Sequence, residues 1–355
     1  MPDPDFLRDR LPALHAALPR FELASLPTPL REHTLRFASR ERRLAVKYDN
    51  LTGELYGGNK IRKLEYILPR ARAKNCLRIA TFGAAGSNHA LATALYARQA
   101  GFACTCFLSH QAMTPLVAAA LNMHIRNKTE LVRYGGTYRT RLQTLRSNLW
   151  GRRAWVIPMG GSSWLGTIGF VAAGLELAAQ VGAGKISAPD RLYVGAGTMG
   201  TAVGIALGLA LAGMQTEVQA VRVSDVSIMN ATKLRTLLDK TALMMRHHDP
   251  SVPVDLASRA RIRIRNEFFG TGYARGTRAT AEAITFAEQE LGLHLESTYT
   301  GKALSALLSD WRQPQYRDTS VLYWHTYNSA ALDVPADKPL DASALPAGFI
   351  RYFAT

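Results

Sequence analysis

Short apolar runs alternate with helical segments along much of the chain. Apolar runs typical of buried strands occupy residues 44–48, 77–82, 102–108, 155–158, 191–194 and 217–224. Between them, apolar residues at helical spacing occupy residues 60–68, 87–100 and 170–181. Strands that alternate with helices favour a mainly parallel sheet with helices on both of its faces. The pattern therefore predicts an α/β fold.

Prolines mark two interruptions in this pattern. Residues 1–20 indicate a helical arm, and residues 26–30, which include Pro27 and Pro29, predict an extended break after it. A helix begins at Lys60, and a further proline follows at position 69. Because proline cannot donate the helical hydrogen bond, we expect a kink or a stop just before it, near residue 68.

The composition is that of an ordinary globular protein. Of 355 residues, 47% are hydrophobic and 20% charged, so we expect one large domain or two domains rather than disorder, collagen or a coiled coil. The formal net charge of +16 favours acidic partners such as nucleic acid, a membrane surface or phosphorylated ligands. The longest apolar run, residues 202–214, is shorter than the ~20 residues of a membrane span, so we expect no membrane association.

The arginines and cysteines of the chain do not indicate a nucleic-acid partner or a bound metal. Arg261, Arg263 and Arg265 alternate with apolar residues, which indicates the exposed face of a strand or, alternatively, a stripe that binds phosphate or nucleic acid. Since the other basic residues are scattered, we expect no nucleic-acid partner. Cys104 and Cys106 lack partners at zinc spacing and are interpreted as buried thiols, so no metal is expected. Three cysteines and no signal peptide predict a cytoplasmic protein.

A glycine-rich turn at residues 195–200 follows a strand and precedes an apolar helix. Its backbone N–H groups and the positive end of the helix are suited to binding a phosphate, with Thr198 and Thr201 as further donors. The turn also matches the dinucleotide fingerprint G-x-G-x-x-G, and Asp225 follows the next strand, where a ribose-binding acid would lie. A close-packed turn without a ligand is the alternative interpretation.

A second glycine-rich turn delivers Lys60 to the first turn of a helix, and Lys63 follows on the same helix face. The helix N-terminus lowers the pKa of a cation placed there, and a neutral amine can form a Schiff base. Lys63 would reach a phosphate as a point charge. Alternatively, both lysines are solvated surface residues, so the motif needs support from other segments.

Three further segments give that support. Residues 83–89 join a strand to a helix that Ser87 caps. There Ser87, Asn88 and His89 offer backbone N–H groups to a carboxylate and side chains to a ring hydroxyl. Tyr273 and Tyr299 each stand beside glycines, where they either reach a ligand or pack in the core as turn aromatics.

Together these segments resemble the pyridoxal-phosphate enzymes of the tryptophan-synthase-β-like fold, and within them the group of D-cysteine desulfhydrase and 1-aminocyclopropane-1-carboxylate deaminase. The resemblance follows the family's order through residues 26–30, 49–53, 57–65, 86–90, 160–166, 197–201, 299–303 and 321–326. It implies a homodimer of two-domain, fold type II architecture, with parallel-rich sheets flanked by helices. A large cofactor-binding domain would comprise residues 1–62 and 165–355, and a small domain, residues 63–164, would cover the active-site cleft.

The resemblance also implies a role for each matching residue. The cofactor, pyridoxal 5'-phosphate, would be bound by Lys60, Lys63, Asn88, Gly197, Thr198, Met199, Gly200, Thr201 and Thr326. Lys60 would hold it covalently and move protons at the substrate Cα, and Thr326 would place a hydroxyl beside the pyridine nitrogen. A small amino-acid substrate would be bound by Ser87, Asn88 and His89. Catalysis would depend on Lys60, Ser87, Tyr273 and Tyr299.

Departures from the family pattern bear on the substrate. Thr300 stands where the deaminase branch has glutamate, which favours the desulfhydrase branch, an α,β-elimination that yields a 2-oxo acid and ammonia. Gly86 replaces the family's usual glutamine, and Tyr327 and Asn328 replace two glycines. A deaminase-like enzyme or one with an atypical substrate is therefore the first alternative. Two others are a nicotinamide-dependent oxidoreductase, using the turn 195–200 and Asp225, and a non-catalytic protein of the same fold.

Overall fold

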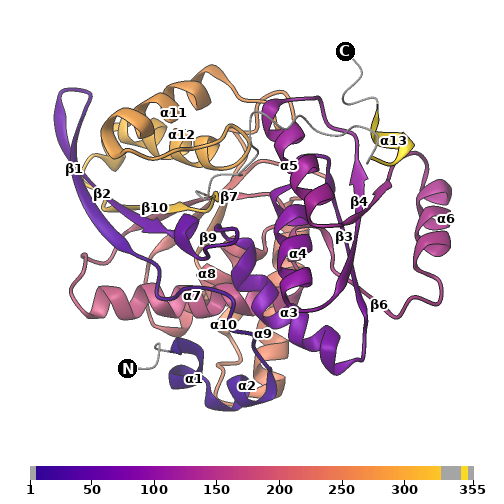
Figure 1. Cartoon of the computed structure of the whole chain (residues 1–355). Helices are drawn as coiled ribbons and strands as arrows, with labels where there is room; N and C mark the ends of the chain where they lie inside the picture. Colours follow the sequence, from indigo (N-terminus) through magenta and orange to yellow (C-terminus); the bar gives the residue numbers. More distant parts are fainter. Residues whose placement is uncertain (1–4, 329–344, 351–355) are drawn as a thin grey trace.

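The computed structural model describes residues 5–328 and 345–350, which contain two β-sheets (Figure 1). The six-stranded sheet has the spatial order β1 (Leu30–Phe37), β2 (Arg40–Tyr48), β10 (Val321–His325), β7 (Arg191–Ala196), β8 (Glu217–Arg222) and β9 (Ile262–Arg265). The four-stranded sheet has the order β5 (Glu130–Arg133), β4 (Ala103–Ser109), β3 (Arg78–Ala84) and β6 (Ala154–Val156). Neighbouring strands run parallel except for the antiparallel pair β1 and β2. The predicted α/β class with parallel-rich sheets is confirmed.

Helices cover both faces of the larger sheet, as predicted. On one face lie α7 (Trp164–Gly182) and α8 (Gly200–Leu211), and on the other lie α11 (Arg278–Leu291) and α12 (Thr300–Trp311). Successive residues of β7 point to opposite faces of the sheet. Leu192 and Val194 pack in the hydrophobic core on the side of α7 and α8, and Tyr193 packs in the core on the side of α11 and α12. By length and composition alone α7 would suffice to cross a membrane, but 72% of its apolar window is buried inside the protein.

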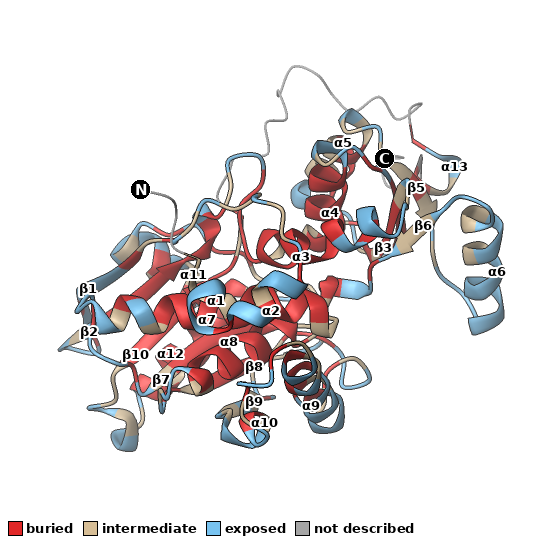
Figure 2. Ribbon diagram, turned by 90° about the horizontal axis from the view of Figure 1, so that it is seen from below, coloured by how far each residue is buried: buried red, intermediate tan, exposed pale blue. Residues whose placement is uncertain are grey.

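The smaller sheet carries its own helices. These are α4 (Asn88–Gln99), α5 (Pro115–Arg126) and α6 (Tyr138–Leu149), while α3 (Lys60–Ala73) packs against both α4 and α7. Figure 2 shows α6 as an exposed helix at the edge of the molecule. All four strands of this sheet fall within the predicted small domain, residues 63–164. The division into two domains stays a prediction, and its outer ends at residues 1–4 and 351–355 lie outside the described residues.

The remaining helices are short, apart from one. They are α1 (Phe6–Arg10), α2 (Pro12–Ala17), η1 (Asp49–Leu51), η2 (Met159–Gly161), α9 (Ala231–His248), α10 (Leu256–Arg259), η3 (Pro314–Tyr316) and α13 (Ala347–Ile350). The predicted N-terminal arm is thus two helices. Leu11 between them has a non-helical backbone, because the proline that follows it disfavours the helical conformation.

Of the kink or stop predicted near Leu68, the stop is wrong, because α3 continues through Pro69 to Ala73. A proline inside a helix leaves the carbonyl four residues earlier without its helical donor. Here that carbonyl belongs to Glu65, and it accepts a hydrogen bond of 2.9 Å from the backbone N–H of Phe21. A segment outside the helix therefore satisfies the carbonyl that the proline leaves unpaired.

The arginine stripe is only partly an exposed face. Arg261 and Arg263 are exposed, but Arg265 is buried and donates to both carboxylate oxygens of Asp310, at 2.7 and 2.9 Å. The interpretation of all three arginines as solvated, or as one phosphate-binding stripe, is therefore wrong for Arg265. Cys104 and Cys106, by contrast, are buried thiols as predicted.

Candidate active site

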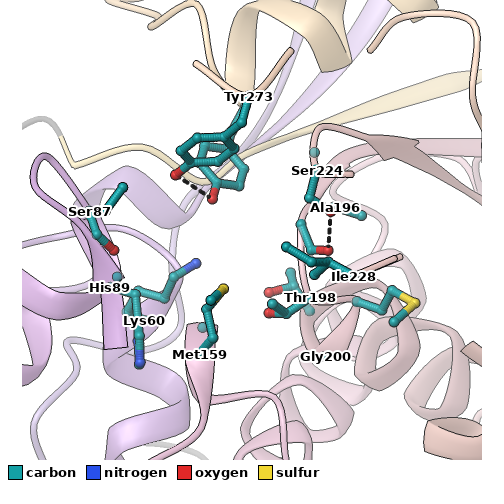
Figure 3. A pocket seen from close by; sticks show the side chains of 18 of the residues that line it. Lys60, Ser87, His89, Met159, Ala196, Thr198, Gly200, Ser224, Ile228 and Tyr273 are labelled. Atoms are coloured by element: carbon teal, nitrogen blue, oxygen red, sulfur yellow. Dashed lines mark hydrogen bonds between the residues drawn. The ribbon is translucent and has the colours of Figure 1, made fainter. Parts of the chain in front are cut away.

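Strand ends from both sheets meet the N-termini of α3, α4 and α8 around a cavity of about 250 Å³. This is where ligands of open α/β sheets bind. Most predicted site residues line it, namely Lys60, Lys63, Ser87, His89, Gly197, Thr198, Met199, Gly200, Thr201, Tyr273 and Tyr299. Figure 3 shows Lys60 and Ser87 facing Thr198 and Gly200 across the cavity, with Tyr273 at one end.

Two predicted residues, Asn88 and Thr326, line a smaller recess of about 20 Å³. The recess adjoins the cavity, because Lys60, His89 and Tyr299 line both. The structure therefore brings all the predicted site residues together around two adjoining spaces.

A tight turn presents Lys60 at the start of α3. Gly58 has a φ of +88°, and a Cβ at Gly57 would overlap the backbone oxygen of Asn50, so the turn requires both glycines. Lys60 Nζ donates to Asn59 Oδ1 at 2.8 Å and lies 5.8 Å from the centre of the Tyr299 ring. The amine therefore lies inside the site rather than in solvent.

Burial lowers the pKa of Lys60 to about 8. The direction is as predicted, but the main cause is the loss of hydration rather than the helix N-terminus. The carboxylate of Glu296 opposes this shift. Near neutral pH a minor share of the Lys60 amine, far larger than that of an ordinary lysine, is therefore neutral and nucleophilic.

Buried charges anchor the helix that carries Lys60. Arg62 of α3 donates to Asp49 at 2.7 Å and to Glu176 of α7 at 2.9 Å. The backbone oxygen of Asp49 accepts from the N–H of Gly58 at 2.9 Å, which ties the cluster to the glycine turn. A buried ion pair of this kind fixes position more than it adds stability.

The turn between β7 and α8 forms a cup that gathers hydrogen-bond donors. Met199 has a φ of +66°, and the N–H of Gly200, at the start of α8, donates to Ser162 Oγ at 3.2 Å. Ser162 Oγ also lies 2.7 Å from Thr198 Oγ1 and 3.2 Å from Lys63 Nζ. The buried lysine loses hydration and faces Lys60, and both effects hold the pKa of Lys63 well below its usual value.

The cup fits a phosphate group. A helix N-terminus, two hydroxyls and a lysine converge there. A bound anion would stabilise the protonated form of the buried Lys63. A Cβ at Gly200 would lie 2.7 Å from Ser162 Oγ and 3.0 Å from Lys63 Nζ, so a side chain there would fill the cup. Ser162 was not singled out from the sequence, although it lies in the matching segment 160–166.

The N-terminus of α4 faces the same cavity. Ser87 Oγ accepts from the N–H of Ala90 at 3.3 Å, so the predicted cap is confirmed and the hydroxyl proton remains free to donate. The ring of His89 hydrogen-bonds to Thr81 at 2.9 Å. Burial and the nearby cations Lys60 and Lys63 keep the pKa of His89 well below its usual value, so its ring is neutral.

The recess side of the site holds two of the departures from the family pattern, Tyr327 and Asn328. Asn88 Oδ1 accepts from the hydroxyl of Tyr56 at 3.1 Å. This contact fixes the side chain so that its amide nitrogen points away from Tyr56 and can donate to a different group. Asn328 Oδ1 accepts from the N–H of Gly57 at 2.6 Å. Tyr327 lines the recess beside Thr326.

Two tyrosines close one end of the cavity. The hydroxyls of Tyr273 and Tyr299 lie 3.2 Å apart (Figure 3). Burial raises the pKa of both, so both are neutral hydroxyl groups at physiological pH. Lys302, which was not among the predicted site residues, donates to the backbone oxygen of Phe269 at 2.6 Å and so holds the loop that carries Tyr273.

The match to a known family covers most of the chain. Residues 22–326 match the family described as "Pyridoxal-phosphate dependent enzyme". The chain belongs to this family. The family assignment confirms the resemblance and the pyridoxal-phosphate cofactor, and it favours this account over the nicotinamide-dependent alternative.

Curated relatives of this pyridoxal-phosphate dependent enzyme extend over most of its length. A D-cysteine desulfhydrase of Salmonella choleraesuis (strain SC-B67) is 30% identical over 329 residues, which is 88% of this chain and 95% of the relative. A D-cysteine desulfhydrase of Klebsiella pneumoniae (strain 342) is 31% identical over the same coverage.

Solved structures of the same fold support the assignment. A crystal structure of an ACC deaminase homologue is 28% identical, covers 92% of this chain and 95% of its own, and has a TM-score of 0.74. A threonine deaminase from T.th. is 18% identical with a TM-score of 0.55, covers 81% of this chain and 88% of its own, and shows the fold alone. The predicted fold type II architecture is confirmed.

Proposed function

We propose that this enzyme is a lyase that converts D-cysteine and water to pyruvate, ammonia and hydrogen sulfide. The observation that carries the proposal is the Lys60 amine, whose pKa is lowered to about 8, facing a phosphate cup in a chain whose curated relatives include D-cysteine desulfhydrases. The individual roles of the site residues belong to this proposal.

The residues present define where the cofactor would be held. The cup around Thr198, Gly200 and Lys63 would bind its phosphate, and Lys60 would bind it covalently. The amide nitrogen of Asn88 would donate to its ring hydroxyl, and Thr326 would face the ring nitrogen. When bound, pyridoxal phosphate supplies the stabilisation of negative charge at the substrate Cα.

The protein supplies orientation and proton transfer. Ser87, with a free hydroxyl proton at the N-terminus of α4, would bind the substrate carboxylate. The Lys60 amine, neutral for part of the time at physiological pH, would accept the proton from Cα. The neutral hydroxyls of Tyr273 and Tyr299 would donate hydrogen bonds to the departing sulfur.

Turnover of D-cysteine by the holoenzyme tests the proposal. Sulfide and pyruvate should appear in equal amounts, and faster than from L-cysteine. Production of 2-oxobutanoate from 1-aminocyclopropane-1-carboxylate, without sulfide from D-cysteine, would instead support the deaminase-like alternative. A holoenzyme that turns over neither substrate nor any other small amino acid would support the non-catalytic alternative.

A structural observation also supports the deaminase-like alternative, namely the TM-score of 0.74 with the ACC deaminase homologue. Against it, Thr300 stands where the resemblance places a glutamate in the deaminase branch. A homodimer also stays a prediction, which the molecular mass of the protein in solution would check.

A further inference from the structure

A buried carboxylate, Glu296, organises the start of α12. It accepts hydrogen bonds from the backbone N–H groups of Thr298 at 2.6 Å, Tyr299 at 2.8 Å and Thr300 at 2.8 Å. It also accepts from Thr300 Oγ1 at 3.0 Å. Glu296 therefore satisfies donors that the first turn of a helix leaves unpaired, and it fixes the backbone that carries Tyr299.

Glu296 is also part of the active site wall. It lines the recess together with Lys60, Tyr299 and Thr326. Among the described residues that line the cavity and the recess, the only other carboxylate is Asp225. Asp225 is exposed whereas Glu296 is buried, so water screens the charge of Asp225 far more than that of Glu296.

The Glu296 carboxylate lies next to Thr300, a position at which this chain differs from the deaminase branch. The resemblance places a glutamate at position 300 in the deaminase branch, and this chain has threonine there. The hydroxyl of Thr300 donates to the carboxylate of Glu296. This chain therefore has a carboxylate beside position 300, supplied by the residue four positions earlier in the sequence. The site therefore has a buried negative charge that the sequence motifs alone do not reveal.

We propose that Glu296 is a positioning residue of the active site, which orients Tyr299 and supplies the buried negative charge that faces Lys60. The proposal rests on the proposed function only in taking Lys60 as the residue that holds the cofactor. Through this charge, Glu296 favours the protonated form of the nitrogen at position 60. Without it, that nitrogen would lose its proton at a lower pH.

The test uses the visible absorption of the holoenzyme, which reports whether the nitrogen joining Lys60 to the cofactor carries a proton. Glu296→Gln keeps the size of the side chain and removes its charge. We expect the pH midpoint of the spectral titration to fall by about one unit. We also expect kcat for D-cysteine to fall about tenfold with little change in KM, because an amine of lower pKa is a weaker base towards Cα and Tyr299 is held less firmly, while Ser87, which binds the substrate carboxylate, is unchanged.

A second pair of variants, matched in size, separates this role from simple helix capping. Glu296→Asp and Glu296→Asn form a second pair that is equal in size and differs in charge, and it serves where Gln at this position prevents folding. The midpoint should stay near the parent value in Asp and fall in Asn. As a control, Asp249→Asn removes a buried carboxylate that accepts from the N–H of Leu14 at 3.2 Å and does not line either space, so its midpoint should not move.

Equal midpoints within the Glu/Gln and Asp/Asn pairs, in folded protein, would overturn the proposal and leave Glu296 as a helix cap. This outcome is independent of the substrate. If the parent holoenzyme releases no sulfide from D-cysteine, the proposed function fails, yet the spectral titration still decides the role of Glu296.

Discussion

The side-chain oxygen of Asn328 accepts a hydrogen bond from the backbone N–H of Gly57, 2.6 Å away. This contact joins the segment after β10 to the turn that presents Lys60, although 271 residues separate the two positions. The resemblance places a glycine at position 328 in relatives, so this chain has its own means of fixing the turn.

Replacing Asn328 should loosen that turn. Asn328→Gly leaves the buried N–H of Gly57 without its partner, so we expect a loss of about 1–3 kcal/mol in the free energy of unfolding, together with a lower kcat. Asn328→Asp keeps an acceptor and should retain more of both. Denaturant unfolding and steady-state kinetics measure the effect, and unchanged values for Asn328→Gly would show that the contact does not matter.

The rate at which the cofactor binds should depend on pH through Lys60. Its pKa of about 8 means that the reactive neutral amine increases as pH rises through that value. When pyridoxal phosphate is added to cofactor-free protein, the rate of appearance of the visible band should therefore rise between pH 7 and 9, with a midpoint near 8. Lys60→Arg should give no such band. A midpoint near the ordinary lysine value of 10.5 would contradict the burial of Lys60.

The phosphate cup predicts a graded loss of cofactor affinity. Lys63→Met removes the cation of the cup, and we expect pyridoxal phosphate to bind about 10–100-fold more weakly, as for loss of a hydrogen bond to a charged group. Ser162→Ala removes one hydroxyl and should have a smaller effect. Equilibrium binding to cofactor-free protein measures both, and unchanged affinity in Lys63→Met would place the phosphate elsewhere.

Restoring the family's glutamine at position 86 should be harmful here. A Cβ at Gly86 would lie 2.9 Å from Val117 Cγ2 and 3.2 Å from Gln111 Nε2, and the N–H of Gly86 donates to Gln111 Oε1 at 3.0 Å. We expect Gly86→Gln to cost about 1–3 kcal/mol of stability, as overpacking does, and to raise KM because it displaces the loop that carries Ser87. Adding Val117→Ala should recover part of the loss. Thermal unfolding and kinetics of the single and double variants would reveal any such recovery, and additive effects would show that Val117 does not cause the strain.

The sequence was informative where a single segment carries the signal. The glycine turns, Lys60 and the Ser87 cap each depend on residues a few positions apart, and the structure brings them together around one site. Contacts between distant segments escaped prediction. The helix can contain Pro69 because Phe21 donates a hydrogen bond to the carbonyl that the proline leaves unpaired, and Arg265 is buried because it pairs with Asp310. Neither partner can be identified from the residues that are close by in the sequence.

The same limit applies to the site residues that were missed. Glu296 has no motif of its own, and its role follows from its contacts with the start of α12. The same holds for Gln111, which lines neither space but contacts Gly86 in the loop that carries Ser87. Strand β1 was missed because its residues Leu30–Phe37 are largely polar, and its pairing with β2 decides its conformation.

Reduction of the holoenzyme with borohydride tests the central claim most directly. The reagent fixes the cofactor on the amine that holds it, and mass spectrometry of peptides then locates the modified lysine. The site described here predicts a single phosphopyridoxyl group on Lys60, with Lys63 unmodified. A phosphopyridoxyl group on Lys63 or on another lysine, or no modification of a protein that has been saturated with cofactor, would contradict it.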